Sequence, residues 1–133
     1  MAIEKYELRI GNIITGDIDG TPGRILQLFD ECAQWTYDLL PSNSVGYNST
    51  TYNYISGIPL SPELLEKCGF TFSDKKAHFT DGYHYYDFAF DKEKRLVYLA
   101  PNTDVRIAHY CDYLHELQNL YWCLCRKELP IQL

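Results

Sequence analysis

The residue types best suited to metal chemistry gather near the C-terminal end of the chain. They are two histidines and three cysteines, namely His109, Cys111, His115, Cys123 and Cys125. Zinc is bound when four such side chains converge tetrahedrally. Cys111 and His115 would share a helical face if the helix included Cys111, whereas Cys123 and Cys125 would point almost oppositely around it. We therefore expect buried structural thiols and no metal ligand. The alternative is a small enzyme or zinc protein that uses His115 and the nearby cysteines.

The patterns of familiar catalytic sites are missing from the sequence. It has no glycine-rich phosphate loop, no G-x-S-x-G elbow and no H-E-x-x-H helix. The stretch 17–20 imitates the start of a calcium loop, but Leu28 stands where the bidentate glutamate belongs. Asp30, Glu31 and Asp87 could act as acid or base, yet their spacing selects no pair. We therefore predict no catalytic residue and no cofactor.

Tyrosine is the outlier of the composition, with 12 residues among 133. Tyrosine offers a large contact area and a hydrogen bond at a small entropic cost, and is therefore common in interfaces. Two groups stand where they could form a binding surface, one in or beside a polar loop and one on an outer sheet face: Tyr47, Tyr52 and Tyr54, and Tyr83 and Tyr85. The alternatives are that these residues simply favour strands, or that an aromatic sheet face stacks single-stranded nucleic acid.

The charge balance argues against nucleic acid. The chain has 18 acidic and 12 basic residues and a net charge of -6, whereas phosphate binding needs clustered Lys and Arg. No run approaches the about 20 apolar residues of a membrane span, and the N-terminus lacks the apolar core of a signal peptide. We expect a cytoplasmic protein with free thiols whose partner is another protein, and no membrane.

The N-terminal part is expected to form a curved antiparallel sheet. A strand that begins at Leu8 and ends at Gly16 carries a bulge or bend at Gly11-Asn12. A turn at 17–23 then leads to a strand over 24–29. A third strand follows at 34–40, and the opening resembles that of an SH3-like barrel. Residues 41–53 lack either hydrophobic period and predict a long polar loop.

The C-terminal part is expected to combine two helices with a β-meander. Ser61 caps a short helix over 62–68, which Gly69 ends. Asp112 caps a longer helix that runs to about Arg126 and covers the sheet with an apolar stripe. The expected strands are 70–72, 77–79, 83–90, 96–100, 105–108 and a terminal edge strand at 129–133. Along 83–90, side-chain alternation predicts a core face of His84, Tyr86, Phe88 and Phe90. That edge could pair with a second copy and give a homodimer.

Three segments carry a resemblance to a family. They are Leu-Arg-Ile-Gly-Asn at 8–12, Gly-Ile-Pro-Leu-Ser-Pro at 57–62 with its continuation to Phe70, and Leu-His-Glu-Leu-Gln-Asn-Leu-Tyr at 114–121. With them the chain resembles small uncharacterised proteins of Bacteroidetes genomes, their phages and mobile elements, a resemblance that implies an origin but no reaction. The motif residues Gly11, Asn12, His115, Gln118 and Asn119 are expected to be structural, with the polar side chains fixing how the helix docks on the sheet. Cys123-Leu124-Cys125 departs from the Ala-Leu-Thr-Gly type ending of that family.

Together these patterns predict an α+β protein of one domain, 1–133. It would have an N-terminal β module at 8–40, a tyrosine-rich loop at 41–53, and at 58–133 a helix, a meander, a C-terminal helix and an edge strand. We expect a non-enzymatic accessory protein of a phage or mobile element that binds another protein, with a host protein and a component of the phage particle as the two alternatives.

Overall fold

The structure, a computed structural model, describes residues 7–16, 22–36, 48–73, 76–80, 85–90, 96–99 and 109–131. Its contacts divide the chain into two compact units. Unit 1 comprises Met1–Pro59 with Tyr113–Asn119, and unit 2 comprises Leu60–Asp112 with Leu120–Leu133. The predicted modules divide the chain differently, because the start of the C-terminal helix groups with the N-terminal strands. Both units are built on antiparallel sheets, and the predicted α+β class is confirmed.

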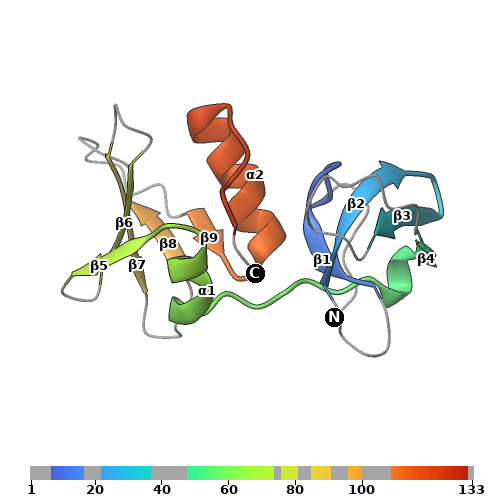
Figure 1. Ribbon diagram of the computed structural model, residues 1–133, viewed down its shortest axis with the longest axis horizontal. Coiled ribbons are helices and arrows are strands. Elements are labelled where there is room, and N and C mark those ends of the chain that lie inside the picture. Colours follow the sequence, from blue (N-terminus) through green and yellow to red (C-terminus); the bar gives the residue numbers. More distant parts are fainter. Residues whose placement is uncertain are drawn as a thin grey trace. The chain divides into compact units, whose positions relative to one another are not determined.

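Unit 1 contains a four-stranded antiparallel sheet whose strands neighbour one another in chain order (Figure 1). The bend predicted at Gly11-Asn12 comes just before the first strand: Gly11 has a φ of 95°, which residues with a Cβ rarely adopt, and the Asn12 N–H donates to the Arg9 carbonyl at 3.0 Å. The first strand is therefore shorter than predicted. The strands are β1 (Ile13–Thr15), β2 (Pro22–Leu28), β3 (Cys32–Thr36) and β4 (Asn48–Thr51).

Trp35 lies at the centre of the unit 1 core. Its side chain is fully buried, and its indole Nε1 donates to the Thr50 hydroxyl at 2.9 Å. A Cβ on Gly16 or Gly23 would come within 2.5 or 2.3 Å of the indole ring, so both positions require glycine for close approach. The indole is packed with Leu8, Ile14, Ile25, Ala33 and Ile55.

The second half of the predicted polar loop is ordered secondary structure, and that part of the prediction is wrong. Asn48–Thr51 forms β4, which pairs with β3 in a register that sets Thr51 opposite Cys32. A 3-10 helix, η2 (Tyr52–Tyr54), follows directly. An edge strand needs main-chain pairing and not an apolar pattern, so periodicity could not reveal it. Residues 41–47 lie outside the described residues.

The strands of unit 1 do not close into a barrel among the described residues. The sheet order is β1-β2-β3-β4, and a single bridge joins Thr15 of β1 to Ser56, with the Ser56 N–H donating to the Thr15 carbonyl at 2.8 Å. The chain after η2 thereby returns to the free edge of β1. The curved N-terminal sheet is thus confirmed as an open antiparallel meander.

The short helix α1 (Pro62–Lys67) forms as its end signals predict. The Ser61 hydroxyl accepts the Leu64 N–H at 3.1 Å, with proline at the first helical position. Gly69 ends the helix with a φ of 89°. Leu64, Leu65 and Cys68 form its buried stripe.

Unit 2 contains a five-stranded antiparallel meander, again in chain order. Aromatic rings fill its core: Phe79 lies 5.5 Å from Phe70 and 4.7 Å from Tyr121 between ring centroids, and Phe88 lies 5.3 Å from Phe70. Of the predicted inward face, Phe88 is buried and Tyr86 stacks on Phe79, whereas Phe90 is half-buried. His84 and the predicted strand at 105–108 lie outside the described residues. The strands are β5 (Thr71–Ser73), β6 (Lys76–Thr80), β7 (Tyr85–Phe90), β8 (Leu96–Leu99) and β9 (His109–Cys111).

The predicted C-terminal helix is α2 (Leu114–Cys125). Its predicted cap, Asp112, is wrong, because Tyr113 directly precedes the helix and its N–H donates to the Glu116 carboxylate at 3.1 Å. The apolar stripe is confirmed by the buried side chains Leu114, Leu117, Leu120 and Tyr121.

The chain after α2 forms no strand in the part that is described. Arg126, four residues before Pro130, ends the helix with a φ of 56°. Its N–H donates to the Trp122 carbonyl at 2.9 Å. Through Ile131 no β-pairing occurs, so the predicted edge strand is wrong over the described residues. Pro130 lacks the N–H that a ladder needs, and Leu129 is buried.

Candidate functional site

At one end of the unit 1 sheet, two segments that carry exposed aromatic side chains are joined by a hydrogen bond. The turn between β2 and β3 is closed by the Phe29 N–H, which donates to the Cys32 carbonyl at 2.8 Å. The Tyr52 hydroxyl, from η2, donates to the Phe29 carbonyl. Phe29 and Tyr54 are 45% and 74% exposed, while Tyr52 is half-buried against the unit 1 core. We call Phe29, Tyr52 and Tyr54, with the turn residues Asp30 and Glu31, the aromatic tip.

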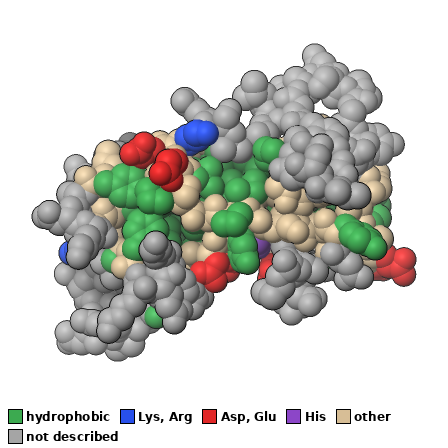
Figure 2. Space-filling view, turned by 90° about the horizontal axis from the view of Figure 1, so that it is seen from below, with side chains coloured by type: hydrophobic (Ala, Val, Ile, Leu, Met, Phe, Trp, Pro, Cys, Tyr) green, Lys and Arg blue, Asp and Glu red, His purple; other side chains and the backbone are tan. Residues whose placement is uncertain are grey.

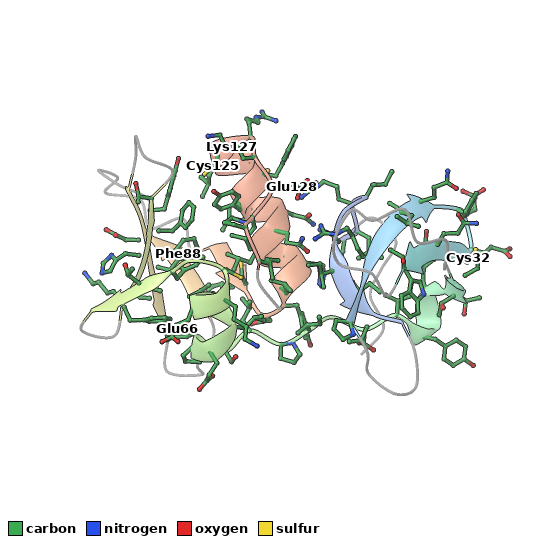
Figure 3. The ribbon with its side chains drawn as sticks, viewed as in Figure 1. Cys32, Glu66, Phe88, Cys125, Lys127 and Glu128 are labelled. Atoms are coloured by element: carbon green, nitrogen blue, oxygen red, sulfur yellow. The ribbon has the colours of Figure 1, made fainter. Side chains whose placement is uncertain are left out.

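The charged residues of the aromatic tip are both acidic. Asp30 and Glu31 are both exposed on the turn, and Cys32, which Figure 3 labels at the end of β3, follows them. The described arginines of unit 1 are bound elsewhere: Arg24 donates to the Gly11 carbonyl at 2.9 Å, and Arg9 donates to Asn119 at 3.2 Å. The tip therefore offers apolar area and negative charge together.

The structure brings together two of the five tyrosines predicted as a binding surface. Tyr52 and Tyr54 share η2, but the structure describes neither Tyr47 nor Tyr83, and of Tyr85 it describes only the place in β7. Phe29 is the contributor that the sequence did not single out. Its position at the end of a strand, one residue before Asp30-Glu31, is the signal that could have found it.

Four of the five motif residues meet at the start of β1. Gln118 accepts the Ile13 N–H at 2.7 Å and donates to the Gly11 carbonyl at 3.1 Å. Asn12 donates to Asn119 at 2.9 Å, and Asn119 donates to the Glu7 carbonyl at 2.9 Å. Asn12 and Gln118 are fully buried. These side chains satisfy backbone groups that no strand or helix satisfies.

His115, the fifth motif residue, is buried without a hydrogen bond. Its side chain is 1% exposed, and neither ring nitrogen has a hydrogen-bond partner among the described residues. A Glu7 carboxylate oxygen lies 3.8 Å from Nε2, and the ring stacks on Tyr113 with centroids 5.8 Å apart. Burial lowers the pKa of His115 to about 4, so the imidazole is neutral near pH 7.

Unit 2 carries a histidine–carboxylate pair that sequence reasoning missed. His78 and Asp87 face each other across β6 and β7, and His78 Nδ1 lies 2.7 Å from an Asp87 carboxylate oxygen. They line an open pocket of about 380 Å³ with Gly69, Thr71, Phe79 and Thr80. Such a pair could orient an imidazole for proton transfer, but the strand register that makes it is not visible in the sequence.

The cysteines are free thiols, and the described residues do not form a metal site. Cys68 and Cys111 are buried, Cys32 and Cys125 are half-buried and Cys123 is exposed. Burial raises the pKa of Cys68 to about 12, which keeps it a thiol. Cys111 belongs to β9 and not to α2, so the condition for a shared helical face with His115 is not met. Among described residues no three His, Cys, Asp or Glu side chains gather as metal ligands would.

Comparisons of the chain with protein-family models, with curated proteins and with solved structures found no match. The described helices are all too short or too polar to cross a membrane.

Proposed function

We propose that the chain is a non-enzymatic protein-binding module whose contact surface is the aromatic tip. The partner is another protein, in keeping with the accessory role in the cytoplasm of a bacterial host that the resemblance to phage and mobile-element proteins suggests. The tip replaces the wider tyrosine surface expected from the sequence, since only Tyr52 and Tyr54 of that set lie together in the described residues.

The observation that carries this proposal is the exposure of two large aromatic side chains on a fixed frame. Tyr54 is 74% and Phe29 45% exposed, and the Tyr52 hydroxyl ties the two segments through the Phe29 carbonyl. Exposed aromatic residues held in place lose little entropy on binding and are common anchors of interfaces. Hydrophobic side chains reach the surface over a wide part of the face drawn in Figure 2. Phe72 on β5 is 39% exposed, which makes a matched control possible.

The charge of the aromatic tip favours a protein over a nucleic acid. Base stacking on aromatic rings works beside positive charge that follows the phosphate backbone, and the charged residues described on this turn are Asp30 and Glu31. The net charge of -6 acts in the same direction. The aromatic rings are therefore better suited to an apolar or basic protein surface.

A pull-down from a Bacteroidetes host lysate tests the proposal. The tagged protein is compared with a Phe29→Ser/Tyr54→Ser variant, and Phe72→Ser on β5 serves as the control for loss of an exposed ring. We expect one protein to be retained in stoichiometric amount by the wild type and by Phe72→Ser. The tip variant should retain at least about tenfold less of this protein, as expected when an interface anchor is removed. Equal retention by all three versions would contradict the proposal.

A further inference from the structure

Among the described residues, β4 is an edge strand that carries neither charge nor proline. Among the described residues it pairs with β3 alone, and its side chains Ser49 and Thr51 are exposed. Natural edge strands are commonly guarded by charges, proline or bulges, but Asn48–Thr51 contains no charge and no proline. The other edge of this sheet, β1, is met by the bridge from Thr15 to Ser56. β4 is therefore the side of the sheet that can accept a further strand.

This edge leads directly into the aromatic tip. Thr51 stands opposite Cys32 in the register, next to the exposed Glu31, and η2 with Tyr54 follows Thr51 in the chain. A strand that lay along β4 would therefore reach Tyr54 and the acidic turn at one end. Main-chain hydrogen bonds would supply affinity and the tip would supply selectivity, as in known cases of strand addition.

Charge decides between a second copy of the chain and a different partner. Two copies paired through β4 would bring two surfaces that carry Asp30 and Glu31 into the same interface, and each chain has a net charge of -6. Like charges across an interface disfavour association, whereas a basic partner would be attracted.

Resting on the proposed function, we infer that β4 binds an extended basic peptide segment of the partner as an added strand. The segment alternates Lys or Arg with β-branched apolar residues, since alternate side chains of a strand lie on opposite faces. Its apolar side chains contact Tyr54, and its basic side chains lie near Glu31.

The test uses two synthetic eight-residue probes, one alternating lysine with valine and one alternating glutamate with valine. Each is titrated to about 1 mM into the ¹⁵N-labelled full chain while amide shifts and amide exchange are recorded. We expect the lysine peptide to shift the amides of β4 and Tyr54 and to slow exchange in β4, and the glutamate peptide to do neither. Shifts at Tyr54 without any change in β4 would overturn strand addition while leaving a binding tip.

Equal binding of both peptides would overturn recognition of a basic partner. The same conclusion would follow if light scattering showed a dimer of the free chain and amide exchange showed β4 protected in that dimer. Absence of any shift with either peptide would overturn the inference, and the pull-down with the tip variant would still decide the proposed function.

Thr51 provides matched variants, because its side chain is exposed and its backbone pairing can remain. Thr51→Lys should weaken binding of the lysine peptide about two- to fivefold, and Thr51→Glu should strengthen it by a similar factor, as for exposed charge pairs. The same direction of change in both variants would contradict recognition by charge.

Discussion

Unit 1 and unit 2 each include part of α2, and they hold it by different chemistry. In unit 1 the helix residues Gln118 and Asn119 bond to backbone groups between Glu7 and Ile13. In unit 2 Tyr121 packs edge-on against Phe79 at 4.7 Å. Hydrogen bonds fix the direction and the register of the helix. Ring packing contributes buried apolar area and tolerates small shifts of the helix. The polar contacts of Gln118 and Asn119 therefore restrict the unit 1 part of the helix to one placement.

The largest expected effect is in the aromatic core of unit 2. Phe79→Ala would remove a ring that contacts Phe70, Tyr86 and Tyr121, and should reduce the free energy of unfolding of unit 2 by about 3–5 kcal/mol. Trp122 belongs to unit 2 and Trp35 to unit 1, so ¹⁹F-labelled tryptophan can follow each unit in one denaturation experiment. A loss confined to the Trp35 signal would contradict this assignment.

The matching change in unit 1 is Gln118→Leu. It keeps the side-chain volume close to that of glutamine but removes the acceptor of the Ile13 N–H. The Gly11 carbonyl loses the Gln118 donor and keeps the Arg24 donor. A buried group left unpaired costs about 1–3 kcal/mol, so we expect unit 1 to lose about 1–3 kcal/mol by the Trp35 signal. If Gln118→Leu left the free energy of unfolding of unit 1 unchanged, the polar contacts would not be what fixes the helix.

His115 should make unit 1 sensitive to acid. Burial lowers its folded-state pKa from 6.5 to about 4, so the unfolded chain takes up a proton at higher pH than the folded chain. The stability that the folded chain gains by keeping His115 neutral is fully present above about pH 6.5 and is lost as the pH falls toward 4. We expect the free energy of unfolding to drop by about 2 kcal/mol between pH 7 and pH 5. His115→Phe keeps a ring beside Tyr113 and should remove this part of the pH dependence. An unchanged slope in that variant would assign the effect to other groups.

The smallest expected effect is at His78 and Asp87 in unit 2. Both side chains are partly exposed, at 29% and 49%, and exposed ion pairs contribute about 0.2–1 kcal/mol. A double-mutant cycle with His78→Ala and Asp87→Ala should give a coupling energy in that range. A coupling above about 2 kcal/mol would show that the pocket holds the pair more firmly than a surface contact.

Sequence reasoning succeeded where a local signal decides the structure. Ser61, Pro62 and Gly69 fix both ends of α1 within a few residues, and the spacing of Leu114, Leu117 and Tyr121 gives the buried stripe of α2. Alternation placed Phe88 inward on β7. These features depend on residues close in the chain, which periodicity and capping rules describe.

Sequence reasoning failed where a distant partner decides the structure. β4 is a strand because β3 lies beside it, although Asn-Ser-Thr-Thr has the composition of a loop. His78 meets Asp87 only through the β6–β7 register, and Phe29 joins Tyr52 only through a hydrogen bond across 23 positions. The aromatic tip was therefore visible in part, as Tyr52 and Tyr54, while Phe29 needed the fold.

Photo-cross-linking inside host cells tests the aromatic tip most directly. A benzoylphenylalanine placed at Tyr54 is compared with one placed at Phe72, so that both probes replace exposed aromatic side chains of the full chain. We predict one discrete protein adduct from position 54 and none from position 72. The same adduct from both positions, or an adduct from position 72 alone, would contradict a binding surface at the aromatic tip.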